Sequence, residues 1–502
     1  MALAVVHGRA ALGVEAPAVA IEVHIASGLP ALSVVGLPEA AVKEARDRVR
    51  SAITNSGFDF PTRRITVNLA PADLPKEGGR FDLPIALGIL AASGQLPTAE
   101  LNDWEFAGEL ALTGELRSVG GLLPMAVRTQ ETGRGLIAPS ACIQEAALAT
   151  PGNAWGAGHL LDVSAHLQGT QRLSPASASP PDAQRSLPDM AEVRGQSQAR
   201  RALEIAAAGG HSVLLAGPPG TGKSMLASRL PGILPAMSNR ECLATAAIHS
   251  VSDQGFDPGN WGERPFRSPH HSASHIALIG GGQRPRPGEV SLAHNGVLFL
   301  DELPEFQRNA LEVLREPLET GQVVISRAAA KLTYPADCQL VAAMNPCPCG
   351  YLGDPAEECR CSPDQIARYA GRISGPLLDR IDMFVEVPRL SAAELRHSQA
   401  GEPSCRIRER VRLARERQHE RDGDSAARLG TADVESACPL TDPASRLLDQ
   451  ALEQLGLSAR AYHRCLRLAR TIADLDGSDT IDESRIAEAV GYRRGPPGMG
   501  RQ

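Results

Sequence analysis

The sequence has almost no lysine. Its 51 basic residues include only four, which are Lys43, Lys76, Lys223 and Lys331. A single arginine is therefore weak evidence for a special role in this chain, whereas a lysine is more informative. The sequence also lacks a net positive charge, since the formal charge is −7. This excludes a globally basic nucleic-acid binder, so any contact with DNA would need local positive loops.

Long apolar runs are also missing. No stretch is long enough to span a bilayer, and residues 1–10 lack the basic start and apolar segment of a secretory signal. We therefore expect a cytoplasmic protein with no membrane partner. Hydrophobic residues make up 43% and charged residues 22%, which is typical of a globular chain. Ten cysteines in such a chain do not predict a disulfide framework.

A segment rich in Ser, Pro and Ala divides the chain. Residues 169–187 have the composition of a flexible linker. Before it, residues 1–168 mix predicted strands with predicted helices, the strands at 18–25, 31–35 and 64–69 and the helices at 39–53 and 81–92. After it, short apolar runs alternate with helices, which predicts a mostly parallel α/β domain over 188–389; the runs lie at 212–216, 297–300, 339–344 and 383–387. Residues 390–502 are predicted to form a helical domain, with helices at 407–421 and 459–474.

One segment of the α/β domain fits the phosphate-loop pattern G-x-x-x-x-G-K-[ST]. With 48 glycines and four lysines in 502 residues, we expect on the order of 0.004 accidental matches. A predicted strand enters the segment and a predicted helix leaves it. Backbone N–H groups there can surround phosphates, Lys223 can reach the β- and γ-phosphates, and Ser224 can hold Mg²⁺. The predicted ATP-binding residues are Gly217, Pro218, Pro219, Gly220, Thr221, Gly222, Lys223 and Ser224.

Polar residues at the ends of later strands complete the predicted site. Asp301 ends an apolar strand and is predicted to contact Mg²⁺, and Glu302 beside it is placed to polarise the attacking water. Asn345 ends the next strand and can orient that water. Two arginines are further candidates: Arg380 for a neighbouring subunit's ATP and Arg460 for the nucleotide of its own chain.

These residues together resemble an AAA+ ATPase of the magnesium-chelatase-like branch. The likeness extends to the segments RPFRSPHHSAS at 264–274, ALIGGG at 277–282, PGEVSLAH at 287–294 and NPCPCG at 345–350. With the N-terminal region included, the whole chain resembles the YifB/ComM family. The resemblance implies an AAA+ P-loop sheet with a helical lid, preceded by an α+β domain of Lon-protease (ribosomal S5-like) fold. It also implies a homo-hexamer that uses ATP and Mg²⁺ to branch-migrate DNA during homologous recombination or natural transformation.

The resemblance assigns roles by position. Asn345 matches a sensor-1 residue, Arg380 an arginine finger and Arg460 a sensor-2 arginine. The segments 269–282 and 324–334 match loops that face the pore of the ring. Arg327 and Lys331 lie in the second, and we predict that they contact the DNA backbone.

The N-terminal domain resembles a protease that has lost its catalytic pair. PKEGGR at 75–80 matches the segment with the nucleophilic serine, and VGGLL at 119–123 matches the one with the partner lysine. Arg80 and Leu123 stand at those two positions. Nucleophilic catalysis needs a hydroxyl and an activating base, so we expect no peptidase activity.

Four cysteines form two C-x-C pairs, Cys347 with Cys349 and Cys359 with Cys361. Four thiolates can make a structural Zn²⁺ site, but zinc pairs are usually spaced C-x₂₋₄-C. Two interpretations of these cysteines therefore stay open, as zinc ligands or as reduced thiols in a loop. The adjacent His270 and His271 would face opposite ways on a strand, which suits an interface or nucleic-acid loop better than a shared metal. For each histidine alone, packing or capping is the favoured interpretation. The arginine-rich segment 406–421 carries an apolar stripe at helical spacing, formed by Ile407, Val411 and Ala414. Its charged side is interpreted as a solvated face in preference to a DNA site.

Three other functions compete with the DNA motor. A magnesium-chelatase subunit would use the same ATPase, but the chelatase ATPase resembled here lacks the N-terminal domain. An ATP-dependent protease is disfavoured by Arg80 and Leu123. A chaperone that remodels proteins is compatible with the sequence.

Overall fold

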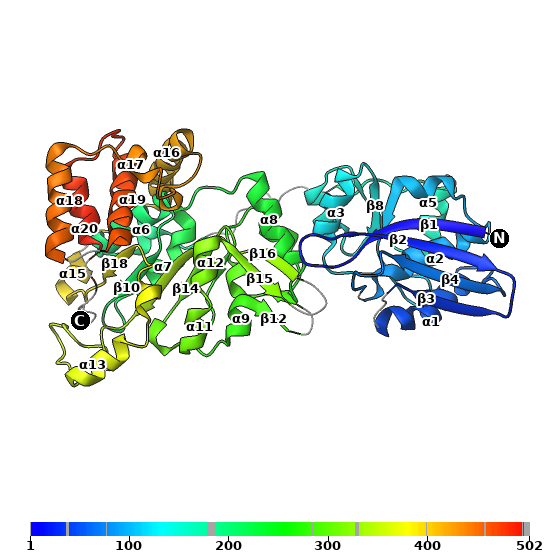
Figure 1. Ribbon diagram of the computed structural model, residues 1–502, viewed down its shortest axis with the longest axis horizontal. Coiled ribbons are helices and arrows are strands. Elements are labelled where there is room, and N and C mark those ends of the chain that lie inside the picture. Colours follow the sequence, from blue (N-terminus) through cyan, green and yellow to red (C-terminus); the bar gives the residue numbers. More distant parts are fainter. Residues whose placement is uncertain are drawn as a thin grey trace.

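The computed structural model describes residues 2–36, 40–76, 78–177, 187–282, 285–326, 331–397, 399–455, 458–493 and 495. An N-terminal domain lies at one end of the molecule, and a group of helices from the C-terminal part lies at the other (Figure 1). A second sheet with its covering helices lies between them. No helix among these residues is both long and apolar enough to cross a membrane.

A seven-stranded mixed sheet forms the N-terminal domain, in the order β3-β4-β2-β1-β5-β8-β9. Alternate residues of β2 and β4 are buried, so one face of the sheet packs on helices. Every residue of α2 is buried. The strands are β1 (Ala2–Arg9), β2 (Ala18–Ala26), β3 (Ala31–Val35), β4 (Arg64–Ala70), β5 (Trp104–Phe106), β8 (Gly135–Pro139) and β9 (Ala154–Ala157), with a small pair β6 (Glu109–Leu110) and β7 (Leu116–Arg117). The helices are α1 (Ala40–Asn55), α2 (Asp82–Ala92), α3 (Leu122–Glu131), α4 (Ile143–Ala149) and α5 (Leu160–Leu167).

The central sheet has five strands, all parallel, in the order β11-β14-β17-β10-β18. Its inner strands β14, β17 and β10 are buried almost throughout, as expected for a parallel sheet covered on both faces. Parallel strands end at one edge, so the residues that follow β10, β14 and β17 meet there. The strands are β10 (Val213–Ala216), β11 (Phe266–Arg267), β14 (Val297–Leu300), β17 (Gln339–Met344) and β18 (Met383–Glu386).

Helices and two short hairpins surround the central sheet. The hairpins are β12 (Gly280–Gly281) with β13 (Arg286–Pro287), and β15 (Gln322–Ser326) with β16 (Lys331–Pro335). The hairpins project from the same side of the sheet, toward the N-terminal domain (Figure 1). The helices are α6 (Ser197–Gly209), α7 (Lys223–Ile233), α8 (Asn239–Ser250), α9 (His275–Ile279), α10 (Glu289–Leu292), α11 (Arg308–Glu312), α12 (Arg315–Thr320), α13 (Pro363–Ala370) and α14 (Gly375–Leu378).

The described chain after β18 is helical. Its apolar residues do not form a core of their own, because Ile407, Val411 and Ile472 belong to one buried cluster with α6 and β10. A hydrogen bond of 2.8 Å between His211 Nε2 and Thr471 Oγ1 and an ion pair of 3.1 Å between Arg464 and Asp382 add polar contacts. The helices are α15 (Ala392–His397), α16 (Ser404–Asp422), α17 (Val434–Ala437), α18 (Asp442–Leu455), α19 (Ala459–Leu475) and α20 (Glu483–Gly491).

The predicted fold class is confirmed. The mixed N-terminal sheet, the parallel α/β sheet and the helical C-terminal part all occur, and the strands predicted at 297–300 and 339–344 match β14 and β17. Within the predicted linker, the amide of Ala176 donates to Ala154 O at 2.7 Å, so the start of that segment packs on the N-terminal sheet. Residues 178–186 of the linker lie outside the described residues.

The interpretation of helix α16 as a plain solvated face is wrong in part. Its apolar stripe is buried as predicted, but several of its arginines fasten it to the α/β domain. Arg410 pairs with Glu204 at 2.6 Å, and Arg415 donates to Ala207 O at 2.9 Å. Arg412, which pairs with Glu409 on the same helix, lies on the solvated face as predicted. These arginines connect the C-terminal helices to the α/β domain. Helical spacing shows which residues share a face of α16, but it does not show which other part of the chain that face contacts.

The residues at the two protease-like positions are both buried. Arg80 is 4% exposed, and its guanidinium donates to Arg9 O at 3.3 Å and to Gly120 O. Leu123 is fully buried in α3. Neither side chain can act as a nucleophile. Arg80 faces a cavity of about 240 Å³ that α/β-domain residues such as Tyr334 also line.

Candidate functional site

The phosphate loop lies between β10 and α7. Gly220 and Gly222 have φ of 78° and 91°, the left-handed region that glycine adopts without strain. A side chain at Gly217 would collide with the carbonyl oxygen of Val387. The glycines are therefore needed for the loop's shape, and this shape turns the N-terminus of α7 toward the cavity described below.

Lys223, the first residue of α7, is buried and bonded to the loop itself. Its Nζ donates to Gly217 O at 2.6 Å, to Pro218 O at 2.8 Å and to Asn345 Oδ1 at 3.1 Å. Burial lowers the pKa of Lys223 to about 8, although the charges of Asp301 and Glu302 oppose this. Lys223, at the start of α7, and Asn345, which follows β17, therefore meet at the phosphate loop.

Asp301 and Ser224 are brought together in the way a magnesium site requires. Ser224 Oγ donates to Asp301 Oδ2 at 2.6 Å, across 77 positions of sequence. Asp301 follows β14, so its carboxylate lies at the same sheet edge as the phosphate loop. A hydroxyl and a carboxylate are ligands that Mg²⁺ accepts beside nucleotide phosphates.

Glu302 has a backbone φ of 52°, which is uncommon for a residue with a side chain. Its side chain is 53% exposed, and Oε2 lies 3.1 Å from Nδ1 of His271. A left-handed conformation at a candidate catalytic residue is consistent with strain held by the surrounding fold. The carboxylate of Glu302 lies beside the phosphate loop and contacts His271.

The two adjacent histidines do not lie on a strand, so the alternation expected for a strand does not apply to them. They follow β11 in an irregular segment, and their ring centroids are 4.1 Å apart. The rings are tilted by 34° to each other, and His271 Nδ1 lies beside the carboxylate of Glu302. The segment that the sequence indicated as an interface loop therefore reaches the candidate catalytic carboxylate.

A cavity of about 370 Å³ joins these groups. Its lining includes Lys223, Ser224, Asp301, Glu302 and Asn345. Three strand ends and one helix N-terminus thus bring a cation, a hydroxyl, two carboxylates and an amide to one space. This arrangement can hold a nucleoside triphosphate with Mg²⁺ and place a carboxylate near an attacking water. The remaining lining residues are Pro219, Gly220, Thr221, Gly222, Met225 and Met344.

Arg380 and Arg460 are not among the described residues that line this cavity. Arg380 is mostly buried beside α12, where it pairs with Glu319 and donates to Arg315 O at 3.0 Å. Arg460, near the start of α19, is exposed. Their roles stay predictions, and that of Arg380 concerns the site of a neighbouring subunit.

The β15–β16 hairpin carries Lys331, which is exposed at the first position of β16. Arg327, the other predicted DNA contact, lies outside the described residues. Alternate residues of both hairpin strands are buried, so the hairpin packs one face on the molecule and presents the other to solvent. A lysine at the free end of such a hairpin is accessible to a polyanion.

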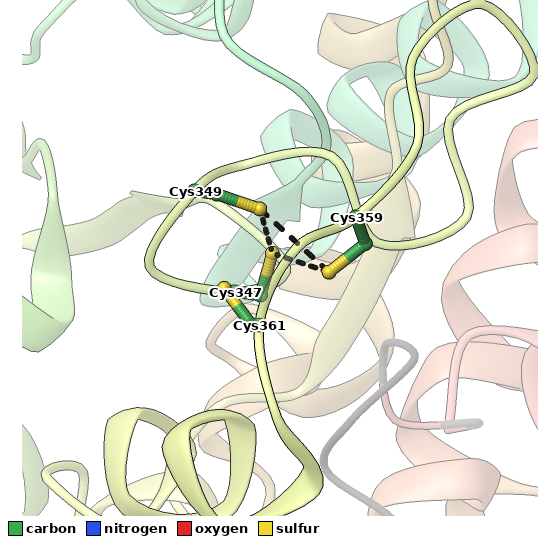
Figure 2. A group of neighbouring side chains, drawn as sticks. All are labelled: Cys347, Cys349, Cys359 and Cys361. Atoms are coloured by element: carbon green, nitrogen blue, oxygen red, sulfur yellow. Dashed lines mark hydrogen bonds between the residues drawn. The ribbon is translucent and has the colours of Figure 1, made fainter.

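The four cysteines are brought together beside the phosphate loop. Their ligand atoms all lie within 4.8 Å of one another, and Figure 2 shows them converging from two parts of one loop. Burial opposes ionisation of Cys349, but hydrogen bonds from the backbone of Tyr351 and Arg360 lower the pKa of this thiol to about 6. The group can hold a metal ion.

Two contacts were missed by the sequence reasoning. Gln196 donates from Nε2 to Pro388 O at 2.8 Å and reaches Thr221 O at 3.5 Å, so it supports the phosphate loop from outside. Its φ of 48° marks it as special, but no sequence pattern shows this. The pairing of His271 with Glu302 joins residues 31 positions apart through an irregular segment, so no periodicity could have indicated it.

ATP binding is expected to weaken above about pH 8. Lys223 is protonated below its pKa of about 8, and anionic phosphates bind the protonated form. Above that pH, binding must first restore the proton, so affinity should fall by up to about tenfold per pH unit. Calorimetric titration with a non-hydrolysable ATP analogue between about pH 7 and 9.5 measures this.

The control for this titration is Lys223→Arg, whose guanidinium stays charged over the whole range. Its affinity is expected to be lower than that of the wild type but independent of pH. A wild-type affinity that does not change up to pH 9.5 would contradict the prediction.

Comparison with known proteins gives matches along most of the chain. Residues 21–142 match a family model described as "Subunit ChlI of Mg-chelatase". Residues 189–395 match one described as "Magnesium chelatase, subunit ChlI". Residues 401–493 match one described as "Magnesium chelatase, subunit ChlI C-terminal". Competence protein ComM of Haemophilus influenzae is 52% identical over 500 residues, which is 98% of each chain. Protein YifB of Escherichia coli is 52% identical over 497 residues, 98% of this chain and 97% of the relative. A magnesium-chelatase 38 kDa subunit of Acidiphilium rubrum is 25% identical over 42% of this chain and 55% of its own.

Proposed function

The chain belongs to the ComM/YifB family of magnesium-chelatase-like AAA+ proteins, and from that premise we propose that it is an ATP-hydrolysing motor that acts on DNA. The motor is a homo-hexamer in the cytoplasm, with ATP and Mg²⁺ between subunits. It drives branch migration during homologous recombination or natural transformation. At the four cysteines it carries a structural Zn²⁺.

ATP hydrolysis is supported by the site itself. The main support is that Lys223, the Ser224–Asp301 pair and Glu302 all line one cavity. Lys223 and the loop amides would bind the phosphates, and Asp301 with Ser224 would hold Mg²⁺. Glu302 would accept a proton from the attacking water, which needs an unprotonated carboxylate beside the γ-phosphate.

The proposal that the motor acts on DNA is supported by the family and by a local positive charge. A relative that matches over 98% of its length is named as a competence protein. The magnesium-chelatase relative matches over only 42% of this chain, which favours the DNA motor over a chelatase subunit. Lys331, one of four lysines in the chain, is exposed on the β15–β16 hairpin. A net charge of −7 confines DNA contacts to such loops.

Branched DNA is expected to raise ATP turnover, and DNA affinity should fall steeply with salt because phosphate contacts release counterions. Turnover with and without a four-way junction, and binding of the labelled junction between about 50 and 300 mM salt, measure both effects. Lys331→Ala should weaken DNA binding regardless of the DNA sequence. The slope of log affinity against log salt concentration should become shallower by about one for each subunit that contacts the DNA.

The matched control is Arg446→Ala. Arg446 is likewise an exposed cation, and it belongs to α18, a helix at the opposite end of the molecule from the N-terminal domain (Figure 1). This variant should keep the wild-type salt slope. No stimulation by DNA together with no binding at low salt would rule out the motor on DNA. Stimulation by unfolded protein instead would favour a remodelling chaperone.

A further inference from the structure

The sulfur atoms of the four cysteines have the spacing of a tetrahedral metal site. Cys347 Sγ lies 3.3 Å from Cys349 Sγ and 3.6 Å from Cys359 Sγ, and the last two are 3.6 Å apart (Figure 2). When the sulfur of Cys361 is included, all four sulfur atoms lie within 4.8 Å of one another. A zinc ion with Zn–S bonds of about 2.3 Å holds its four sulfurs roughly 3.8 Å apart.

The loop that carries these cysteines is held by its four thiols and by Arg389, which pairs with Asp354 and Glu357 and lies over the ring of Tyr351. No helix or strand lies between Met344 at the end of β17 and Pro363 at the start of α13, a stretch that is described throughout. Loops of more than about 12–15 residues without secondary structure are uncommon in compact domains. An ion pair of 3.2 Å between Asp354 and Arg389 holds the middle of the loop, and the four thiols hold its two ends together.

Backbone amides also point at the sulfurs. Hydrogen bonds reach Cys349 Sγ from the backbone of Tyr351 and Arg360, and Cys359 Sγ from the backbone of Cys361. Such bonds stabilise negative charge on sulfur and orient metal ligands. The described cysteines form no disulfide, and their spacing is well above the length of an S–S bond.

This loop also touches the nucleotide site at two points. Cys347 comes two positions after Asn345, whose Oδ1 accepts the bond from Lys223 Nζ at 3.1 Å. Gly350 packs so tightly against the phosphate loop that a Cβ there would lie 2.7 Å from Pro219 Cδ. The positions of Asn345 and of the phosphate loop therefore depend on how the cysteine loop is held.

We propose that Cys347, Cys349, Cys359 and Cys361 bind one Zn²⁺ ion, and that this ion braces Asn345 and the phosphate loop for ATP turnover. Thiolate ligands in a tetrahedral arrangement select zinc over Mg²⁺, which prefers oxygen ligands in an octahedron. The ion is structural, because four protein sulfurs leave no open coordination position. The second half of this inference rests on the ATP hydrolysis proposed above, whereas the first half does not.

Zinc content tests the first half. Protein purified without added metal is expected to contain about one zinc per chain by elemental analysis. Cys359→Ser should lose it, while Cys405→Ser, which removes an exposed cysteine of α16 outside the cluster, should keep it. A wild-type protein without zinc would overturn the proposal. So would visible absorbance with stoichiometric iron, which indicates an iron–sulfur cluster.

ATP turnover without DNA tests the second half. Loss of zinc in Cys359→Ser is expected to lower kcat by about 10–100-fold while ATP still binds, because the substitution removes none of the residues that line the nucleotide cavity. Unchanged turnover after zinc loss would overturn the brace. Because DNA is absent, this result is independent of whether the motor acts on DNA, and wild-type turnover in the same assay tests ATP hydrolysis separately.

A folded wild-type sample provides the second route if Cys359→Ser does not fold. Zinc is removed with a zinc-selective chelator, and hydrogen exchange is followed by mass spectrometry. Residues 347–361 and the phosphate loop should both lose protection, whereas helices α1 and α2 of the N-terminal domain should not change. Protection that persists in the phosphate loop would contradict the brace.

Discussion

Glu302→Gln is expected to bind ATP and to turn it over about 10²–10⁴-fold more slowly than the wild type. The amide keeps the size of the carboxylate but cannot accept the proton of the attacking water. Lys223, Ser224 and Asp301 are untouched, so the affinity for ATP should change little. Single-turnover hydrolysis and equilibrium binding of labelled ATP measure the two quantities separately.

Glu305→Gln is the matched control for this substitution. Glu305 lies three positions further along, pairs with Arg372 at 2.7 Å and is not among the residues that line the nucleotide cavity. Its loss should leave turnover near that of the wild type. Turnover by Glu302→Gln at the wild-type rate would remove Glu302 from the role of base.

Arg380→Ala is expected to lower turnover by about 10³–10⁵-fold if the side chain acts as an arginine finger. In its own chain, Arg380 lies beside α12 and outside the described lining of the cavity. A direct contact of Arg380 with ATP must then be made in the site of a neighbouring subunit. Turnover is measured together with oligomeric state, because Arg380 also pairs with Glu319 and its loss can disturb the local packing.

Mixing two inactive variants distinguishes a shared site from local damage. When Arg380→Ala and Lys223→Ala chains assemble together in equal amounts, about a quarter of the interfaces combine a native phosphate loop with a native arginine. Activity should therefore reappear on mixing. A mixture of Lys223→Ala with Glu302→Gln should stay inactive, because both residues belong to the same side of each site. No recovery in the first mixture would exclude the shared site.

The parts of the site that were predictable from sequence are those built on strand ends. The apolar runs at 297–300 and 339–344 coincide with β14 and β17, and a parallel sheet must bring the residues after them to one edge. Asp301 and Asn345 could therefore be placed near the phosphate loop from sequence alone. The contacts of Ser224 with Asp301 and of Lys223 with Asn345 follow from that arrangement.

Contacts carried by irregular segments were not predictable. The pairing of His271 with Glu302 and the support of the phosphate loop by Gln196 depend on loop conformations without periodicity. The union of α16 and α19 with the core of the α/β sheet was also missed. A helical apolar stripe shows that a face is buried, but it does not identify the surface that covers it.

The packing of Arg80 and Leu123 bears on the evolutionary history of the N-terminal domain. If this domain descends from a protease, restoring serine and lysine at these two positions would not return it to that state. Leu123 is fully buried, and a lysine there would lose the hydration of its charge. Arg80 now joins the backbone of Arg9 to that of Gly120, so a serine would leave both carbonyl groups without this donor. A serine–lysine pair could therefore not be created here by these two substitutions alone, because the packing around both positions would have to change as well.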